Sequence, residues 1–328
     1  MILQVHLQPT LYGGASKHTS IFIDNLDSAF LLSTKKNIYL YNKFKNHERA
    51  YFPPSNVLCQ TICALILMSK YSFKVVHSHH RRDFFLALGL KIFGLRHVHT
   101  LHGIYSAQGL YLSYLKKTTL VAISEYVKSW HIKNNGMSDS VEVIYNGVVD
   151  LGVLASQEEL EFDITWIGTL ELGVKRPNIL KKHLEHILEK GLRVAVVGSG
   201  SYLKELEKIQ SPYLTLTGYS NDVGGIIAKS RFVWSTALEE GLGRTLIEAF
   251  SLSTPVIGMG QGGAGEIICD GINGFAMYDD NTENLLKILY NSEKSYHKLS
   301  ANARKSYEDK FTIAEFISRY SQKYADQF

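Results

Sequence analysis

The chain has 328 residues, 45% hydrophobic and 20% charged, with a net charge of +4 when histidine is counted as neutral. This composition is ordinary for a globular protein, and the length accommodates two domains with a core each. No run of about twenty apolar residues occurs, which excludes a membrane-spanning helix. The odd number of cysteines, Cys59, Cys63 and Cys269, argues against a disulfide framework and for a reducing, cytoplasmic location. The first seven residues lack the basic start of a secretory signal.

Charge is distributed unevenly between the two halves. Residues 1–155 hold 16 Lys and Arg against 8 Asp and Glu, whereas the remainder hold 19 against 23. A basic half is typical of a protein that meets an anionic surface, such as phospholipid or a phosphorylated acceptor, although solvated lysines without a partner give the same count. The sequence has no helix-turn-helix, RNA-recognition or zinc-finger pattern, so we expect no nucleic-acid partner.

The first half alternates between short apolar runs and longer amphipathic segments. Strands are predicted at Ile2–Leu7, Phe30–Ser33, Ile38–Tyr41, Val75–His79, His97–Leu101, Leu120–Ile123 and Val141–Tyr145. Helices are predicted at Ser55–Lys70, Asp83–Phe93 and Glu125–Asn134, with another that begins near Ala15. Such alternation indicates a parallel, doubly wound sheet.

The pattern restarts after Asp150, beyond a polar stretch at Ser156–Asp163. Strands are predicted at Ile164–Ile167, Val194–Val197, Leu214–Thr217, Phe232–Ser235, Val256–Gly258 and Phe275–Met277. We therefore predict an α/β protein with two tandem doubly wound Rossmann-like domains, at residues 1–152 and 153–312. A C-terminal helix at 313–328 would pack back on the first domain. Ligands of such sheets bind at the carboxyl ends of the strands.

The stretch EEGLGRTLIEAF (Glu239–Phe250) places Glu240 and Glu248 on either side of a glycine-flanked turn that opens a helix. A helix start offers backbone N–H groups to an anion, while ionised carboxylates accept hydrogen bonds from hydroxyls. A ligand with both phosphates and sugar rings would satisfy the whole stretch. An ordinary helix start with acidic residues near its positive end also accounts for it.

Three other glycine-containing loops follow predicted strands. PTLYGGAS carries Gly13 and Gly14, which would allow backbone N–H groups to approach a phosphate. WIGTLELGVKRPN carries Lys175 and Arg176, which would neutralise a diphosphate or simply be solvated. A tight strand-to-helix turn explains VVGSGSY without a ligand. None of these loops is a GxGxxG or P-loop motif.

Histidines gather at two strand ends, in HSHH (His77–His80) and HVHTLH (His97–His102). Such clusters can bind zinc, but alternation puts only His97 and His99 on one face, and no cysteine accompanies them. We therefore expect no metal, with one or two histidines facing a ligand and the others packed or on the surface.

Taken together, these motifs resemble glycosyltransferase family 4, which comprises retaining nucleotide-sugar enzymes of the GT-B fold. The most specific match is EGLGRTLIEAFSLSTPVIG (Glu240–Gly258), which is similar to the Glu-x7-Glu motif of the family and continues into GGAGEIICDGINGF. Further matches are the Gly13–Gly14 loop, VVHSH, HTLHG, AISEYVK, VIYNGVV and TGYSND. The resemblance covers nearly the whole chain and is more specific in the second half.

The resemblance implies a role for each matching residue. Glu248 would bind the ribose of the donor nucleotide, and Glu240 would hold the transferred sugar together with the backbone of Gly241, Leu242 and Gly243. Lys175 and the backbone at Gly13 and Gly14 would contact the diphosphate, and His102 would lie beside the sugar. Gly218 and Tyr219 would lie near the base.

The sequence departs from the family pattern at Thr169, where an arginine usually follows the glycine at the end of the strand. One of two expected phosphate cations is therefore absent from its place, and Arg176 or Arg244 is a candidate replacement. The departure at Ser253–Thr254, before Pro255, affects a position where glycine is common, and we expect it to alter packing alone.

The resemblance implies a metal-independent, retaining transfer of sugar from a UDP- or GDP-type donor to a saccharide or lipid-linked acceptor, without a cofactor. We expect a role in bacterial surface polysaccharide synthesis and a cytoplasmic location, with peripheral contact to an anionic membrane. A sugar-nucleotide epimerase or hydrolase on the same scaffold remains an alternative. A second alternative is a non-catalytic subunit that binds sugar nucleotides.

Overall fold

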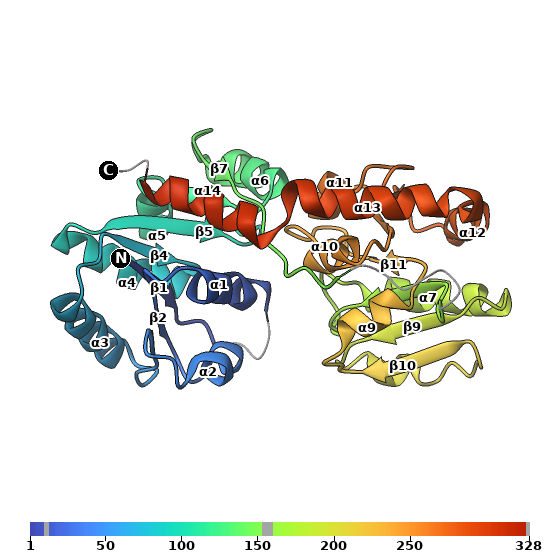
Figure 1. The fold of residues 1–328 in the computed structure, drawn as a ribbon, viewed down its shortest axis with the longest axis horizontal. Helices are drawn as coiled ribbons and strands as arrows, with labels where there is room; N and C mark the ends of the chain where they lie inside the picture. Colours follow the sequence, from blue (N-terminus) through green and yellow to red (C-terminus); the bar gives the residue numbers. More distant parts are fainter. Residues whose placement is uncertain (10–12, 153–159, 326–328) are drawn as a thin grey trace. The chain divides into compact units, whose positions relative to one another are not determined.

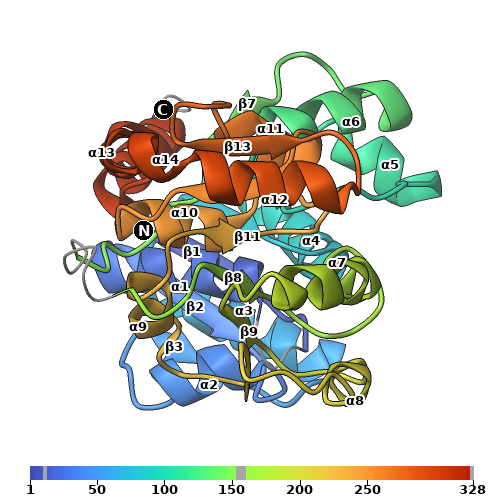
Figure 2. The ribbon, with the colours of Figure 1, turned by 90° about the vertical axis from the view of Figure 1, so that its right-hand side faces the viewer.

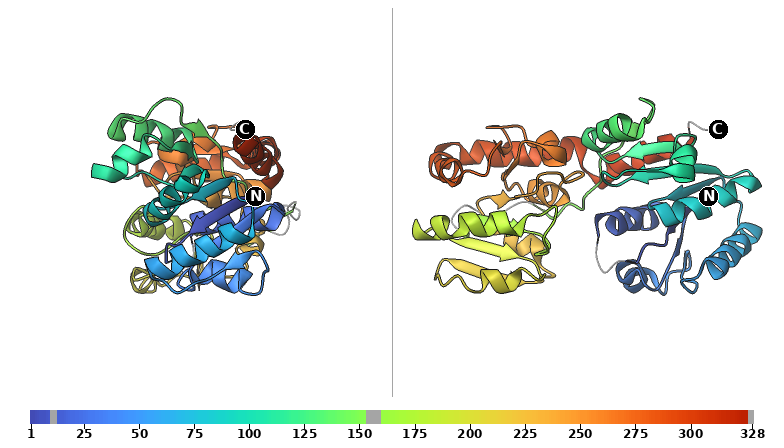
Figure 3. Two further views of the ribbon diagram at one scale, coloured as in Figure 1. Left: turned by 90° about the vertical axis from the view of Figure 1, so that its left-hand side faces the viewer. Right: turned by 180° about the vertical axis from the view of Figure 1, so that it is seen from behind.

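A computed structural model describes residues 1–9, 13–152 and 160–325. The chain divides into two compact units: unit 1 contains Met1–Gly147 and Ile313–Phe328, and unit 2 contains Val148–Thr312. Each unit is built around one parallel sheet with helices on both faces (Figures 1, 2 and 3).

Unit 1 has seven parallel strands in the order β3-β2-β1-β4-β5-β6-β7. Their bounds are β1 Ile2–His6, β2 Ala29–Ser33, β3 Ala50–Tyr51, β4 Val75–Ser78, β5 Arg96–Leu101, β6 Thr119–Ala122 and β7 Glu142–Val143. The order reverses direction between β1 and β4, so the carboxyl ends of these neighbours form a topological switch point.

The helices of unit 1 are α1 Gly14–Asn25, α2 Ile38–Phe44, α3 Val57–Lys70, α4 Arg81–Leu90, α5 Gly109–Leu115, α6 Glu125–Asn135 and α14 Ile313–Ala325, with a 3-10 turn η1 at Lys91–Phe93. One face of the sheet packs against α1, α2 and α14, through Phe22, Leu40 and Phe316 among others. The opposite face packs against α3 and α4, through Ala64 and Leu90 among others. Alternation along β1 sends Ile2 to the first core and Leu3 to the second.

Unit 2 has six parallel strands in the order β10-β9-β8-β11-β12-β13. Their bounds are β8 Ile164–Ile167, β9 Val194–Val197, β10 Leu214–Gly218, β11 Val233–Trp234, β12 Val256–Met259 and β13 Gly274–Met277. The helices are α7 Pro177–Glu189, α8 Leu203–Leu206, α9 Val223–Ala228, α10 Arg244–Ser251, α11 Gly262–Ile267, α12 Thr282–Asn291 and α13 Tyr296–Lys310, with η3 at Glu293–Ser295. Figure 2 shows α7 and α12 next to each other, and both bury leucines in the core around Trp166. The topological switch point of the unit 2 sheet lies between β8 and β11.

The predicted strand at Ile38–Tyr41 is wrong, because these residues begin helix α2. The Asn37 side chain accepts a hydrogen bond from the Leu40 N–H, at 3.1 Å, and caps the helix. Leu40 and Phe44, one helical turn apart, are the two buried residues of α2. The sequence analysis predicted no strand at β3 and no helix at α5, both of which the structure contains.

The unit boundary falls between Gly147 and Val148, five residues before the predicted limit at residue 152, and α14 belongs to unit 1. Phe316, Tyr320 and Tyr324 of α14 are buried in the core of unit 1. Within the described residues, no helix combines the length and the apolar character that crossing a membrane requires.

Candidate active site

The loops after β8 and β11 meet at the switch point of unit 2 and carry Lys175 and Glu240. The Lys175 ammonium donates to Glu240 Oε1 at 2.7 Å, and the two side chains are 17% and 20% exposed. Sequence reasoning placed Lys175 after a strand end and Glu240 beside a glycine turn that opens a helix, and the structure brings the two into direct contact across 65 positions.

Thr236 fixes the backbone beneath this ion pair. Its hydroxyl donates to the Lys175 carbonyl at 2.6 Å and accepts from the Trp166 indole N–H at 2.9 Å. The Lys175 side-chain stem passes close to Gly168, at the end of β8. Sequence reasoning missed Thr236, because nothing in the local pattern shows that its hydroxyl would reach a residue 61 positions away.

Glu240 is held by only one of its carboxylate oxygens. Oε1 accepts from Lys175, whereas the buried Oε2 has no hydrogen-bond partner among the described residues. A buried, unpartnered carboxylate oxygen is costly, and ligand hydroxyls are suitable donors for it. This arrangement therefore indicates a site prepared for a hydroxyl-bearing ligand.

Helix α11 supports the glycine turn Gly241–Leu242–Gly243 from below. The Gly263 N–H donates to the Glu240 carbonyl at 2.8 Å. A Cβ atom at Gly263 would lie 2.4 Å from the Leu242 Cα, so any other residue would displace the turn. The sequence GGAGE therefore contributes to the site through packing, a role that its glycines alone did not reveal.

Gly243 is the N-cap of α10 with φ of +85°, and no side chain caps this helix start. The two predicted glutamates thus lie on either side of this helix N-terminus, since Glu240 precedes Gly243 and the half-buried Glu248 lies in α10. Backbone N–H groups and the helix dipole favour an anion there.

Gly218 is the last residue of β10, the edge strand two strands away from β8, and Tyr219 follows it. The Gly218 carbonyl accepts from the Gly198 N–H at 2.8 Å, and Gly198 in turn packs directly on the Gly168 carbonyl, leaving no room for a Cβ. The VVGSGSY turn thus has a packing role. Tyr219 is 51% exposed.

Arg176 adopts a left-handed backbone conformation, with φ of +51°, at the start of α7. Its guanidinium pairs with the Asp280 carboxylate and donates to the Thr236 carbonyl at 3.3 Å. Arg176 is therefore tied to the protein, which weakens its candidacy as the replacement cation. Arg244, the other candidate, is the first residue of α10, and Thr169 is exposed.

In unit 1, Gly13 and Gly14 lie at the start of α1, after β1, with Gly13 as the N-cap in extended conformation. His102 follows β5, and its Nε2 lies 3.1 Å from His79 Nδ1. These three predicted residues belong to unit 1, whereas the other predicted site residues belong to unit 2.

Several histidines of unit 1 lie buried on β4 and on the neighbouring strands and helices. His97 and His99 share one face, as predicted, and both contact the Ser78 hydroxyl, at 2.6 and 2.7 Å. His77 lies between Thr100 and Tyr324, at 2.7 Å from each hydroxyl. Burial lowers the pKa of His6, His77, His79, His99 and His102 well below 6.5, with repulsion between neighbouring histidines adding to the effect.

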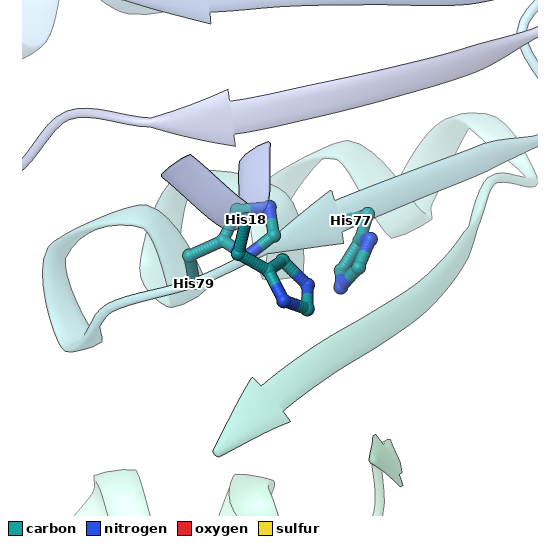
Figure 4. A group of neighbouring side chains, drawn as sticks. All are labelled: His18, His77 and His79. Atoms are coloured by element: carbon teal, nitrogen blue, oxygen red, sulfur yellow. The ribbon is translucent and has the colours of Figure 1, made fainter. Parts of the chain in front are cut away.

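Among the residues that the structure describes, His18, His77 and His79 could bring nitrogen ligands to a metal, because one ring nitrogen of each lies within 4.8 Å of the others (Figure 4). Both ring nitrogens of His77 and of His79 already have protein partners, which include Gln4 and His102 for His79. A metal would have to displace these hydrogen bonds. His18, on α1, was not among the predicted metal candidates.

Comparison with known proteins identifies the class. A family model described as Glycosyl transferases group 1 matches residues 161–291, and one described as Glycosyltransferase Family 4 matches residues 40–150. The chain belongs to the family 4 glycosyltransferases and has their GT-B fold of two parallel-sheet α/β domains.

Two relatives and one solved structure show the extent of this similarity. The chain is 25% identical to an uncharacterized glycosyltransferase of Methanocaldococcus jannaschii, over 99% of both chains. It is 25% identical to the Vi polysaccharide biosynthesis protein VipC/TviE of Salmonella typhi, over 57% of this chain and 37% of that protein. The crystal structure of Anabaena HepE in complex with UDP-glucose superposes with a TM-score of 0.82 at 18% identity, covering 99% of both chains.

Proposed function

We propose that this glycosyltransferase transfers a sugar from a nucleoside-diphosphate-sugar, of UDP or GDP type, with retention of anomeric configuration. The observation that supports this most directly is the Lys175–Glu240 pair with its unpartnered carboxylate oxygen, beside an uncapped helix start. A cation and backbone N–H groups suit a diphosphate, and the carboxylate suits sugar hydroxyls. The Anabaena structure that shares the fold contains UDP-glucose, which agrees with a donor of this class.

In this proposal each residue of unit 2 has one role. Glu240 Oε2 accepts hydrogen bonds from the transferred sugar, Lys175 contacts the distal phosphate, and the Gly241–Gly243 backbone donates to the same phosphate. Glu248 binds the ribose, and Gly218 with Tyr219 lies near the base. His102, Gly13 and Gly14 of unit 1 retain the roles that the family resemblance implies, beside the sugar and the diphosphate.

Departure of the nucleoside diphosphate builds negative charge on the distal phosphate. Lys175 and the start of α10 would stabilise that charge, as preorganised donors do in other transferases, so we propose that the reaction needs no metal or cofactor. We assign no carboxylate among the described residues as a nucleophile, and we propose same-face attack in which the leaving phosphate accepts the proton of the acceptor.

For the acceptor we propose a saccharide or lipid-linked saccharide of a bacterial surface polysaccharide, with the enzyme in the cytoplasm at the inner membrane face. The partial similarity to the Vi polysaccharide protein supports a polysaccharide context. The excess of basic residues in the first half supports an anionic surface as the place of reaction.

Product analysis separates this function from its alternatives. Purified protein is incubated with UDP-glucose, GDP-mannose and related donors, with and without a mixed oligosaccharide acceptor, and the products are resolved by mass spectrometry. Transfer predicts release of nucleoside diphosphate that depends on the acceptor. Conversion of the donor without acceptor would identify an epimerase or hydrolase, and donor binding without any turnover would identify a non-catalytic subunit.

A further inference from the structure

Helix α3 of unit 1 is apolar on both of its sides. Gln60, Ala64 and Leu67 face the sheet and are buried. The opposite side carries five large hydrophobic residues that are 39–70% exposed: Val57, Leu58, Ile62, Leu65 and Ile66. The first charged residue of the helix is Lys70, at its C-terminus. A surface helix ordinarily carries polar residues on its outer side, so this face lacks the usual solvent-facing pattern.

Helix α4 and the following turn η1 continue this apolar face. Phe85, Ile92 and Phe93 are 43%, 82% and 53% exposed. Between these residues and α3 runs an apolar groove of about 530 Å³, lined also by Leu86, Leu90 and the aliphatic part of α3. This volume lies within the range of ligand pockets and would accommodate hydrocarbon chains.

The polar residues around the face carry positive charge. Helices α3 and α4 and the turn η1 carry four basic residues, Lys70, Arg81, Arg82 and Lys91, and one acidic residue. The acidic residue, Asp83, is buried and accepts from the N–H groups of Leu7 and His80, so it does not offset the basic charge at the surface. Arg82 lines the groove itself and donates to the Ser55 carbonyl, while Arg81 and Lys91 flank it in sequence.

We propose that this α3–α4–η1 face docks on an anionic lipid bilayer, with its apolar side chains among the lipid chains and its basic side chains at the headgroups. Exposed apolar area surrounded by Arg and Lys is the combination that binds interfacial segments to anionic membranes. An apolar protein partner would be favoured by the groove but not by the one-sided charge. The inference deepens the proposed function, since a lipid-linked acceptor would be presented at that membrane.

Flotation with vesicles of phosphatidylcholine alone, or of phosphatidylcholine and phosphatidylglycerol in equal parts, tests the docking. The wild-type protein is expected to float with the mixed vesicles. The apolar triple variant Leu58→Gln/Ile62→Gln/Ile92→Gln should lower the partition constant on the order of 100-fold, because exposed side chains lose burial in lipid. The basic triple variant Arg81→Gln/Arg82→Gln/Lys91→Gln should lower it about fivefold per charge and remove the preference for phosphatidylglycerol.

Ile272→Gln is the matched control, because Ile272 is 54% exposed but lies in unit 2. It should float as the wild type does. All substituted residues are exposed, so the variants should keep the wild-type circular dichroism. Equal flotation of all variants, or no flotation of the wild type, would overturn the proposal. A dimer that the apolar variant dissociates would assign the face to a second copy and would also overturn it.

Nucleoside-diphosphate affinity, measured on the same samples by calorimetry, keeps this test independent of the proposed function. Vesicle binding by a protein that binds no nucleotide would refute the donor site and leave the docking face standing. Nucleotide binding without vesicle binding would refute the docking face and leave the donor site standing.

Discussion

The two switch points of the molecule handle polar groups in opposite ways. At the switch point of unit 1, histidines around β4 are buried, neutral and bonded to one another or to hydroxyls, as in the contacts of His77 with Thr100 and Tyr324. At the switch point of unit 2, Lys175 and Glu240 form a partly exposed ion pair, and one glutamate oxygen has no partner among the described residues. Both ring nitrogens of His77 thus have partners within the protein, although Nδ1 of the neighbouring His97 has none among the described residues. The unpartnered group of unit 2 differs in being a carboxylate oxygen, for which ligand hydroxyls are suitable donors.

The difference teaches that density of polar residues is a poor guide to a binding site. Ten of the thirteen histidines lie in the first 155 residues, and this drew attention to them as metal ligands. Many of them hydrogen-bond to protein groups, as His77 does to Thr100 and Tyr324, whereas the candidate site of unit 2 consists of two charged side chains and a glycine turn.

The largest expected effect is a selective loss of stability of unit 1 in acid. Burial lowers the pKa of five of its histidines below 6.5, so below pH 6.5 the unfolded state binds more protons than the folded state: His6, His77, His79, His99 and His102. The contribution of these histidines to the free energy of unfolding is therefore fully present above about pH 6.5. It decreases as the pH is lowered further, by about 1.4 kcal/mol per pH unit for each such histidine. Five histidines make the loss several kcal/mol.

Hydrogen exchange of peptides from each unit, after incubation in urea at pH 7.5 and 5.5 and labelling at one common pH, checks this expectation. Among the described histidines of unit 2, only His183 has a lowered pKa, which burial brings to about 4. Unit 1 should therefore lose protection first. Equal losses in both units would contradict the contrast.

Glu240→Gln is expected to have the next largest effect. It keeps the shape of the side chain but removes the charge that pairs with Lys175 and accepts from ligand hydroxyls. Charge-assisted hydrogen bonds contribute about 1.5–3 kcal/mol each, so turnover of the sugar nucleotide should fall on the order of 100- to 1,000-fold. Glu239→Gln is the matched control, because Glu239 is adjacent and exposed. Similar rates for the two variants would remove Glu240 from the site.

Gly263→Ala tests the support beneath the glycine turn. The new Cβ would meet the Leu242 backbone, and overpacking of this kind costs about 1–3 kcal/mol. We expect lower stability in urea and a nucleotide affinity reduced about tenfold. Gly89→Ala is the control, since a Cβ there meets nothing within 4 Å. A variant of Gly263 with unchanged nucleotide affinity would show that the turn does not contact the ligand.

Tyr324→Phe should have the smallest effect, confined to unit 1. The hydroxyl accepts from Gln4 Nε2 at 3.2 Å and lies 2.7 Å from His77 Nδ1. Its removal leaves two buried polar groups without that partner and should lower the free energy of unfolding by about 1–3 kcal/mol, with nucleotide affinity unchanged. A change in nucleotide affinity would show that the two switch points are coupled.

Much of the fold follows from the sequence because its strands are short apolar runs separated by helices. β8 and β9 match their predicted bounds, and most of the other predicted strands differ by one or two residues. The strand predicted at Ile38–Tyr41 was wrong because a run of aromatic and aliphatic residues fits a strand or a buried helix equally well. The Asn37 cap decided the outcome, since it satisfies the Leu40 N–H.

The candidate site was predictable only in part. Lys175 could be placed after a strand end and Glu240 beside a helix-opening turn, but the sequence did not show that the two would form an ion pair. The support from Thr236, Asp280 and Gly263 could not be predicted, because it depends on contacts between distant segments, such as the 104 positions between Arg176 and Asp280. The assignment of each residue to a part of the donor remains a proposal.

Calorimetric titration of UDP, GDP, ADP and CMP, without added metal, into wild type and Glu248→Ala tests the donor site of unit 2 most directly. Glu248 lies in α10 and is half-buried, so the substitution removes the proposed ribose contact at the edge of the site. We predict that UDP or GDP binds the wild type and that the variant loses most of this affinity. Absence of binding by every nucleotide, or equal affinity in the two proteins, would contradict the account.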